Sequence, residues 1–376
     1  MNIDINHSLE IFLTVDYEIY FGRSLMTQEE ILLAPTKELL ESCSAINVPL
    51  TMFCDVNYIA KLQEWGDFSL VAKIEEQLCK AISMGHDVQL HIHPHWEFTT
   101  RDKDGSFHFA DNHYLLGTRF TDTATRKMDI TQAIAKGKDY LENLLKPVAS
   151  SYNCCAYRAG GYGLQPYEGD MLAALIDNGI KIDSSVIPGY KMQSKVHMID
   201  FSDLVGRSHN WYGPVDGLAA PAMQNSGLLE IPIATADLQQ SQWNPWPEAL
   251  TKVIQQMWYG GSPYQPRGEP VGWQVPPKTP IMQRAKLSWW ALNAVLNAGE
   301  AKLEMYRDVG RMLAITLGHV QRETALNGVH RLAVIGHPKG MHTAHFKTLQ
   351  DYVTQLRKRY KQSIRFLSMS ELAGTL

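Results

Sequence analysis

Short apolar segments alternate with amphipathic helical segments through most of this 376-residue chain. In the helical segment at residues 35 to 46, Leu39, Leu40 and Cys43 form an apolar stripe, whereas the segment PLTMF that follows is too short for a helix. Such alternation is typical of parallel sheets whose strands are connected by helices. About seven or eight strands are expected, which favours a distorted (β/α) barrel over an open doubly wound sheet. The expected strands cover residues 9 to 15, 50 to 54, 87 to 92, 154 to 157, 181 to 183, 228 to 233, 332 to 335 and 363 to 368.

Three histidines, His91, His93 and His95, occupy alternate positions in the motif GHDVQLHIHPHWEF, at the end of one expected strand. Side chains two or four residues apart on a strand point to the same face, so these imidazole rings can converge. Converging imidazoles are typical ligands of a divalent metal ion. The motif therefore predicts a metal site at a strand end.

Two acidic residues, Asp16 and Glu18, follow the first expected strand at the same spacing. Both carboxylates are expected on one face at the C-terminal end of that strand, where α/β proteins assemble their active sites. One carboxylate could bind the metal while the other stays free as a base.

Two further strands are followed by polar side chains. Arg158 precedes a glycine-rich turn in CCAYRAGGYG and can pair with a carboxylate to keep it ionised. His337 follows the strand in RLAVIGHPKGM, and a lone histidine there is more often structural. Polar side chains follow four of the expected strands, which would bring them to the same end of the barrel. This repeated placement favours a functional role for His337 over a structural one.

Composition and charge exclude some partners. The formal net charge of −4 and the scattered Lys and Arg residues leave no basic stripe for nucleic acid. The N-terminus lacks the pattern of a signal peptide and no stretch is long and apolar enough for a membrane span, so we expect a cytoplasmic protein. The five cysteines show no CxxC spacing and are expected to be free thiols in the core.

We expect a single domain over residues 1 to 376, with an insertion or cap at about 240 to 330 where the strand–helix alternation stops. Four tryptophans in this insertion could stack on a sugar ring or could equally be core residues. They are Trp243, Trp246, Trp258 and Trp273.

The motifs TVDYE, GHDVQLHIHPH, YRAGGYG and IGHPK occur in an order that resembles the polysaccharide deacetylase superfamily, the NodB-like enzymes of carbohydrate esterase family 4. The resemblance spans residues 10 to 340, although it depends on about 30 of them. The first motif departs from the usual adjacent aspartates, and the arginine motif lacks the usual proline.

The resemblance implies a set of roles. The metal ligands would be Glu18, His91 and His95, with one divalent ion, Zn²⁺ before others. Asp16 would be the catalytic base, although Asp16 and Glu18 could exchange roles. The other implied site residues are Arg158, His337 as general acid and Asp183 as the acid that orients it, with His93, Trp96 and Tyr162 toward the substrate.

The resemblance also implies an activity, the metal-dependent removal of an N-acetyl group from an amino sugar. The substrate would be an N-acetylated sugar, nucleotide sugar or glycan intermediate, with surface polysaccharide synthesis as the expected setting. The alternatives are a non-catalytic carbohydrate-binding barrel and a hydrolase of another C–N amide bond. A non-haem iron oxygenase also uses two histidines and a carboxylate, but usually on an all-β scaffold.

Overall fold

The structure is a computed structural model, and it describes residues 8–20, 27–103, 107–109, 114–194, 196–223, 225–241, 243–259, 281–296 and 299–376.

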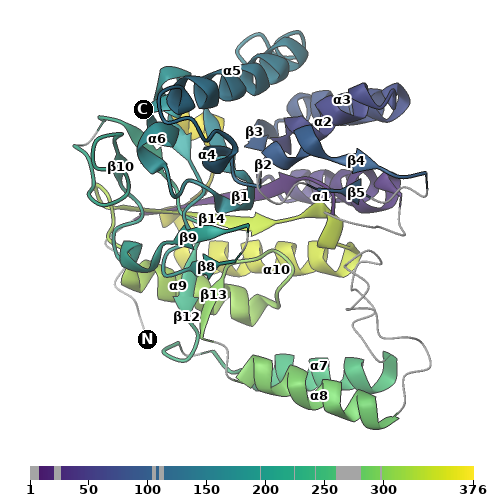
Figure 1. The fold of residues 1–376 in the computed structure, drawn as a ribbon. Helices are drawn as coiled ribbons and strands as arrows, with labels where there is room; N and C mark the ends of the chain where they lie inside the picture. Colours follow the sequence, from purple (N-terminus) through teal and green to yellow (C-terminus); the bar gives the residue numbers. More distant parts are fainter. Residues whose placement is uncertain are drawn as a thin grey trace.

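A ring of parallel strands forms the centre of the molecule (Figure 1). In ring order the strands are β1 (Ser8–Tyr17), β2 (Leu50–Asp55), β3 (Asp87–Ile92), β6 (Ala156–Ala159), β7 (Ile182–Asp183), β11 (Leu228–Glu230) and β14 (Val329–Gly336). From β14 through β1 to β11 each strand pairs in parallel with its neighbour, and β14 pairs with β1 along eight residues.

The ring closes just after β11. Ile233 forms a parallel bridge with Ala333 of β14. Two backbone hydrogen bonds hold this join, from Ala234 N to Ala333 O at 3.0 Å and from Ala333 N to Pro232 O at 2.8 Å. The expected distorted barrel is therefore confirmed, with its closure made by a short, irregular segment.

Two strands extend the sheet outside the ring. β10 (Trp211–Tyr212) runs antiparallel to β11, and β15 (Ile364–Phe366) pairs with the first half of β1. Three small antiparallel hairpins lie apart from this sheet: β4 (Thr100–Arg101) with β5 (Phe107–His108), β8 (Lys191–Gln193) with β9 (Met198–Asp200), and β12 (Thr235–Asp237) with β13 (Glu300–Lys302).

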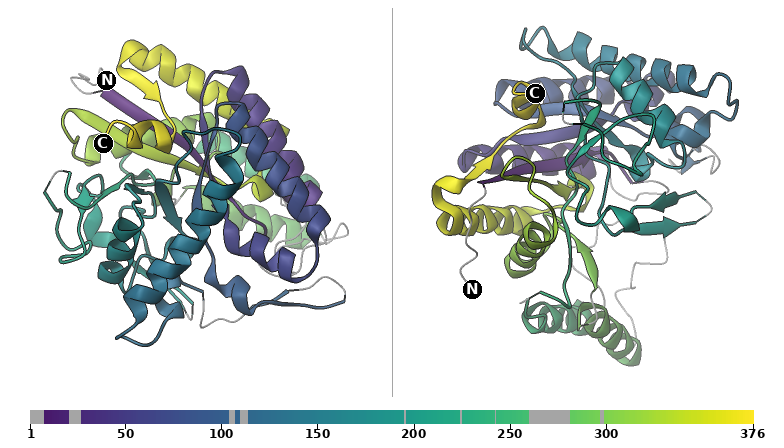
Figure 2. Two further views of the ribbon diagram at one scale, coloured as in Figure 1. Left: turned by 90° about the horizontal axis from the view of Figure 1, so that it is seen from above. Right: turned by 90° about the vertical axis from the view of Figure 1, so that its left-hand side faces the viewer.

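Helices cover the outside of the ring (Figures 1 and 2). Their bounds agree to within a few residues with the helices that the sequence pattern predicts near 35–46, 68–84, 130–146, 167–178 and 343–359, and only α2 has no predicted counterpart. They are α1 (Ala34–Ala45), α2 (Val56–Glu64), α3 (Phe68–Ser83), α5 (Arg126–Leu145), α6 (Glu168–Asp177) and α10 (Thr343–Tyr360). The shorter helices are η1 (Glu29–Leu33), η2 (Pro94–Phe98), α4 (Leu116–Arg119), η4 (Gly160–Tyr162), η5 (Ser202–Leu204), η6 (Pro338–Gly340), η7 (Lys361–Ser363) and α11 (Met369–Ala373).

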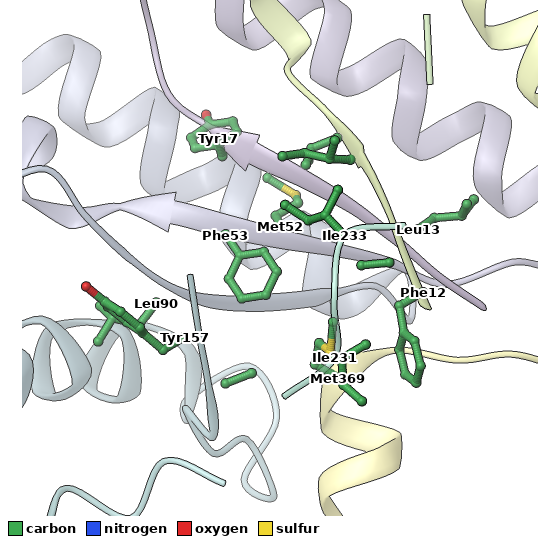
Figure 3. Packing of buried hydrophobic residues seen from close by; sticks show 14 of the residues in the cluster. Phe12, Leu13, Tyr17, Met52, Phe53, Leu90, Tyr157, Ile231, Ile233 and Met369 are labelled. Atoms are coloured by element: carbon green, nitrogen blue, oxygen red, sulfur yellow. The ribbon is translucent and has the colours of Figure 1, made fainter. Parts of the chain in front are cut away.

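The central strands are buried on both faces. All residues of β2, β3 and β6 are buried, as expected for strands with a packed interior on one side and helices on the other. Figure 3 shows part of this core, in which Phe53, Tyr157 and Ile233 lie among the strands.

In its described residues, the segment expected as an insertion holds three helices, α7 (Trp246–Tyr259), α8 (Ile281–Leu296) and α9 (Val309–Arg322). In Figure 1, α7 and α8 lie side by side at a distance from the ring. α7 is joined to α9 by an ion pair, with Arg311 NH1 at 3.1 Å from Glu248 Oε1. Residues 260 to 280, with Trp273, lie outside the described residues, as does the side chain of Trp258. Among the helices described, none has the length and apolar character that crossing a bilayer requires.

Candidate metal centre

The side chains at the end of β1 alternate between the two faces of the barrel wall. The hydroxyl of Tyr17 donates to Gln77 of α3 on the outside, at 2.8 Å. Asp16 and Glu18, one residue to either side, point the opposite way, and both are buried.

Glu18 lies with two histidines from the end of β3. Glu18, His91 and His93 each offer a ligand atom, and these atoms lie within 4.8 Å of one another. Glu18 Oε2 is 2.7 Å from His93 Nε2 and 3.4 Å from His91 Nε2. A carboxylate and two imidazoles form a donor set that suits zinc and related divalent ions.

The ring of His91 is oriented by the backbone. Its Nδ1 lies 2.7 Å from the carbonyl oxygen of Arg158, which can only accept, so Nδ1 carries a proton and Nε2 faces Glu18. Burial opposes protonation of this ring, but Glu18 and Asp16 raise the pKa of His91 to about 9. A metal ion would displace the proton on Nε2, because a ligating imidazole is neutral.

Two buried atoms in this group fit a bound cation. Within the described part of the chain, Glu18 Oε2 and His91 Nε2 have ion-pair contacts but no well-aligned hydrogen bond. Such buried polar atoms are costly, and an ion between them would satisfy both. The other oxygen, Glu18 Oε1, accepts from Lys339 Nζ at 2.8 Å, which leaves Oε2 as the ligand.

His95 lies beside this group and not in it, in contrast to the expected pair of His91 and His95. β3 ends at Ile92 and the chain enters η2, so the strand alternation does not extend to His95. Its ring stacks on Tyr114, with centroids 5.2 Å apart and planes 10° from parallel. Burial lowers the pKa of His95 to about 2, so the ring is neutral. His93, expected as the additional histidine, takes the place beside Glu18.

Asp16 forms a buried ion pair with Arg158, whose NH1 lies 2.8 Å from Asp16 Oδ1. The guanidinium is fixed by Ser184, whose carbonyl and hydroxyl oxygens accept from Nε and NH2 at 2.8 Å each, and it lies over the ring of Phe53. Burial opposes ionisation of Asp16, but Arg158 and His337 hold the pKa of its carboxyl well below the usual range. Asp16 is therefore a carboxylate at all ordinary pH values.

His337, which follows β14, faces both carboxylates. Its Nε2 lies 3.5 Å from Asp16 Oδ2 and 3.6 Å from Glu18 Oε1. Its side chain is 19% exposed, so it can be reached from solvent while the ligand group is buried. This position suits a residue that exchanges a proton with a substrate.

The turn of η4 packs directly on the histidines. A Cβ at Gly160 would lie 2.7 Å from His93 Nδ1, and Gly161 and Tyr162 have φ angles of 61° and 59°. A glycine at position 160 therefore lets the backbone approach the metal group closely. Tyr162, expected to face the substrate, follows immediately in this turn.

Two expected site residues lie away from the reacting groups. Trp96 is fully buried and donates its Nε1 to Asp55 Oδ2 at 2.7 Å, so its ring packs in the core. Asp183 accepts from the hydroxyl and backbone N–H of Ser185, at 2.8 and 3.0 Å, and the structure shows no contact with His337.

Asp55 and Lys339 belong to the site but were not selected from the sequence. Asp55 accepts from the backbone N–H of His93 at 3.2 Å and so positions the histidine turn. Lys339 contacts Glu18 as described above and also donates to Ile19 O at 3.1 Å. Both could have been found, because Asp55 directly follows an expected strand and Lys339 lies in the same motif as His337.

No protein-family model and no curated protein matches the chain. Among solved structures, a polysaccharide deacetylase from Mycobacterium smegmatis is similar at 12% identity and a TM-score of 0.43, covering 100% of this chain and 92% of that one. The peptidoglycan deacetylase PdaC from Bacillus subtilis is similar at 17% identity and a TM-score of 0.28, over 61% of this chain and 76% of that one.

The 4-alpha-glucanotransferase from Thermococcus litoralis is also similar, at 12% identity and a TM-score of 0.41, although this chain spans only 40% of it and 98% of this chain is covered. At 12–17% sequence identity, a proposal about function has to be argued from the geometry of the site and not from these similar structures. Two of these structures are named as deacetylases, and at TM-scores below 0.5 none of the three indicates a function for this chain.

Proposed function

We propose that the protein is a metal-dependent hydrolase that removes the N-acetyl group from an amino sugar or glycan intermediate. The observation that carries the proposal is the buried group of Glu18, His91 and His93 beside a carboxylate, Asp16, that Arg158 keeps ionised. Metal ligands and a separate base are the two requirements for activating a water molecule at neutral pH.

Glu18, His91 and His93 would hold the ion. In this ligand set His93 takes the position that the resemblance gives to His95. When bound, a divalent ion supplies a Lewis acid that lowers the pKa of a water molecule and polarises an acyl oxygen. Zn²⁺ is the expected ion, because imidazole and carboxylate ligands suit it.

The other residues would move and stabilise charge. Asp16 accepts a proton from the attacking water, and Arg158 keeps Asp16 ionised between turnovers. His337 donates a proton to the departing amine, since it faces Asp16 and is open to solvent. Backbone N–H groups of the Gly160–Tyr162 turn are the candidates for stabilising the negative charge on the acyl oxygen.

The test combines elemental analysis of the purified protein with a screen for acetate release from N-acetyl sugars and their nucleotide forms. We expect one divalent ion per chain and acetate release that Asp16→Asn abolishes without loss of the ion. A protein that binds these sugars but releases no acetate, in the presence of any divalent ion, would be the non-catalytic carbohydrate-binding barrel. Release of ammonia or another amine from amides that are not sugars would instead indicate the other alternative, a hydrolase of another C–N amide bond.

A further inference from the structure

A cluster of charged and aromatic side chains lies next to the proposed catalytic centre, at the last residue of β13 and on the residues that follow it. Leu303 N donates to Ala234 O at 2.8 Å, and Ile335 N donates to Leu303 O at 3.0 Å. Glu304 is bridged to Ile335 in parallel register, two residues before His337. Beyond the bridge between Ile233 and Ala333, this segment therefore lies between Ala234 and the end of β14, at the same end of the barrel as the metal group.

Lys302 connects this segment to the η4 turn, Gly160–Tyr162, which packs on the histidines. Its Nζ lies 3.4 Å from the hydroxyl of Tyr162, and it faces the rings of Tyr162 and Tyr190 with centroids at 5.1 and 5.7 Å. Tyr162 belongs to the η4 turn, in which Gly160 contacts His93. The ammonium is thus separated from the metal group by one short turn of chain.

The carboxylate nearest to Lys302, Glu304, is shared with a second and closer cation, Arg307. Glu304 accepts from the hydroxyl of Tyr306 at 2.6 Å and from Arg307 Nε at 2.7 Å, and Arg307 NH2 also contacts it closely. Lys302 Nζ is 3.8 Å from Glu304 Oε1, beyond hydrogen-bonding distance. One carboxylate therefore faces two cations, and the surplus positive charge is on the side of Tyr162.

This surplus charge is partly removed from water, because the side chain of Lys302 is only 23% exposed. A sheltered ammonium with one long hydrogen bond and two ring faces retains donors for an anion, and such a charge-assisted bond is stronger than a neutral one.

We infer that Lys302, with Tyr162 and Tyr190, binds an anionic oxygen group of the substrate, a phosphate or a carboxylate carried by the N-acetylated sugar. The inference rests on the proposed function and narrows it to anionic amino sugars. A lysine ammonium is a compact point charge, so it accepts either group without a bidentate geometry.

The experiment compares N-acetylglucosamine with its 6-phosphate, its uridine diphosphate form and N-acetylmuramic acid, for the metal-loaded protein. We expect at least one anionic sugar to have a higher kcat/KM than the neutral sugar. In Lys302→Met this preference should fall by roughly tenfold or more, and Lys302→Arg should restore part of it. Lys127→Met, which removes an equal charge from α5, should leave the preference unchanged and so excludes long-range steering.

Calorimetric binding of the same sugars to the Asp16→Asn protein separates this inference from the proposed function. An anionic sugar that binds Asp16→Asn, and binds much more weakly when Lys302→Met is added, supports the inference even if no acetate is released. If no anionic sugar binds better than the neutral one, or if Lys302→Met weakens both kinds equally, the inference is wrong. A phosphorylated sugar that binds when the carboxylated one does not would assign the subsite to phosphate.

Discussion

At the scale of single residues, the choice between His93 and His95 is the sharpest question about the proposed centre. The motif resemblance selects His95, whereas the structure places His93 Nε2 at 2.7 Å from Glu18 Oε2 and stacks His95 on Tyr114. We expect His93→Ala to lose the bound ion and His95→Ala to keep it. Metal content of the two purified variants, with thermal unfolding as a control for folding, makes the comparison. If His95→Ala loses the ion and His93→Ala keeps it, the metal ligands are His91 and His95, as the resemblance implies.

Glu304 provides a pH prediction at the same scale. Burial opposes its ionisation, but Arg307 and Lys302 lower its pKa from 4.5 to about 2. A depressed pKa contributes stability that is complete above the unfolded pKa and is lost as the pH falls through the folded one. The shift corresponds to about 3 kcal/mol near neutral pH.

We therefore expect Glu304→Gln to lower the unfolding temperature at pH 7, and this difference from the natural protein should shrink below pH 4.5, toward zero near pH 2. Thermal unfolding scans at pH 7, 5.5, 4.5 and 3.5 measure it. A difference that stays constant across this range would show that the charge of Glu304 does not stabilise the fold.

At the scale of secondary-structure elements, the position of the histidines depends on the contact between β2 and the turn after β3. Asp55, the last residue of β2, accepts from the backbone N–H of His93 at 3.2 Å and from Trp96 Nε1 at 2.7 Å. One carboxylate thus holds both the start of η2 and a ligand, and residues in this supporting position typically change metal affinity when they are replaced.

Asp55→Ala should weaken metal binding by roughly 10- to 100-fold and also lower stability by about 1–3 kcal/mol, since a buried donor loses its partner. Isothermal titration with Zn²⁺ and thermal unfolding of the metal-free protein measure the two effects. Asp55→Asn keeps one acceptor and should lie between the natural protein and Asp55→Ala. Unchanged metal affinity in Asp55→Ala would mean that β3 alone positions His93.

At the scale of the whole molecule, the proposed ion would join strands that are distant in the sequence. Glu18 comes from the end of β1 and His91 from β3, and β2 lies between these strands in the ring. A ligand that binds only the folded state stabilises it, by about 2.7 kcal/mol when its concentration is 100 times the dissociation constant.

We expect Zn²⁺ to raise the unfolding temperature of the natural protein in a concentration-dependent way and a chelator to reverse the shift. His91→Ala should show no such shift, whereas Lys127→Met, a surface change on α5, should behave like the natural protein. A shift of equal size in His91→Ala would mean that the ion binds elsewhere.

The sequence by itself determined the barrel and the end of it where the site forms. Apolar alternation defines strands whose side chains have a period of two, so the sequence alone assigns Asp16, Glu18, Arg158 and His337 to one edge of the sheet. The closing of the ring through residues 232–234 and the extra helix α2 were not predictable, because they depend on how distant segments pack.

Only the tertiary structure decided which histidine faces Glu18. The period of two holds along β3 but ends at Ile92, and the direction of His95 is then set by η2 and by its contact with Tyr114. The surplus charge of Lys302 beside Tyr162 likewise joins residues more than 100 positions apart, whereas the pairing of Arg158 with Asp16 agrees with the charge pairing expected from the sequence. Local periodicity carries no information about such distances, so these contacts are a property of the folded chain.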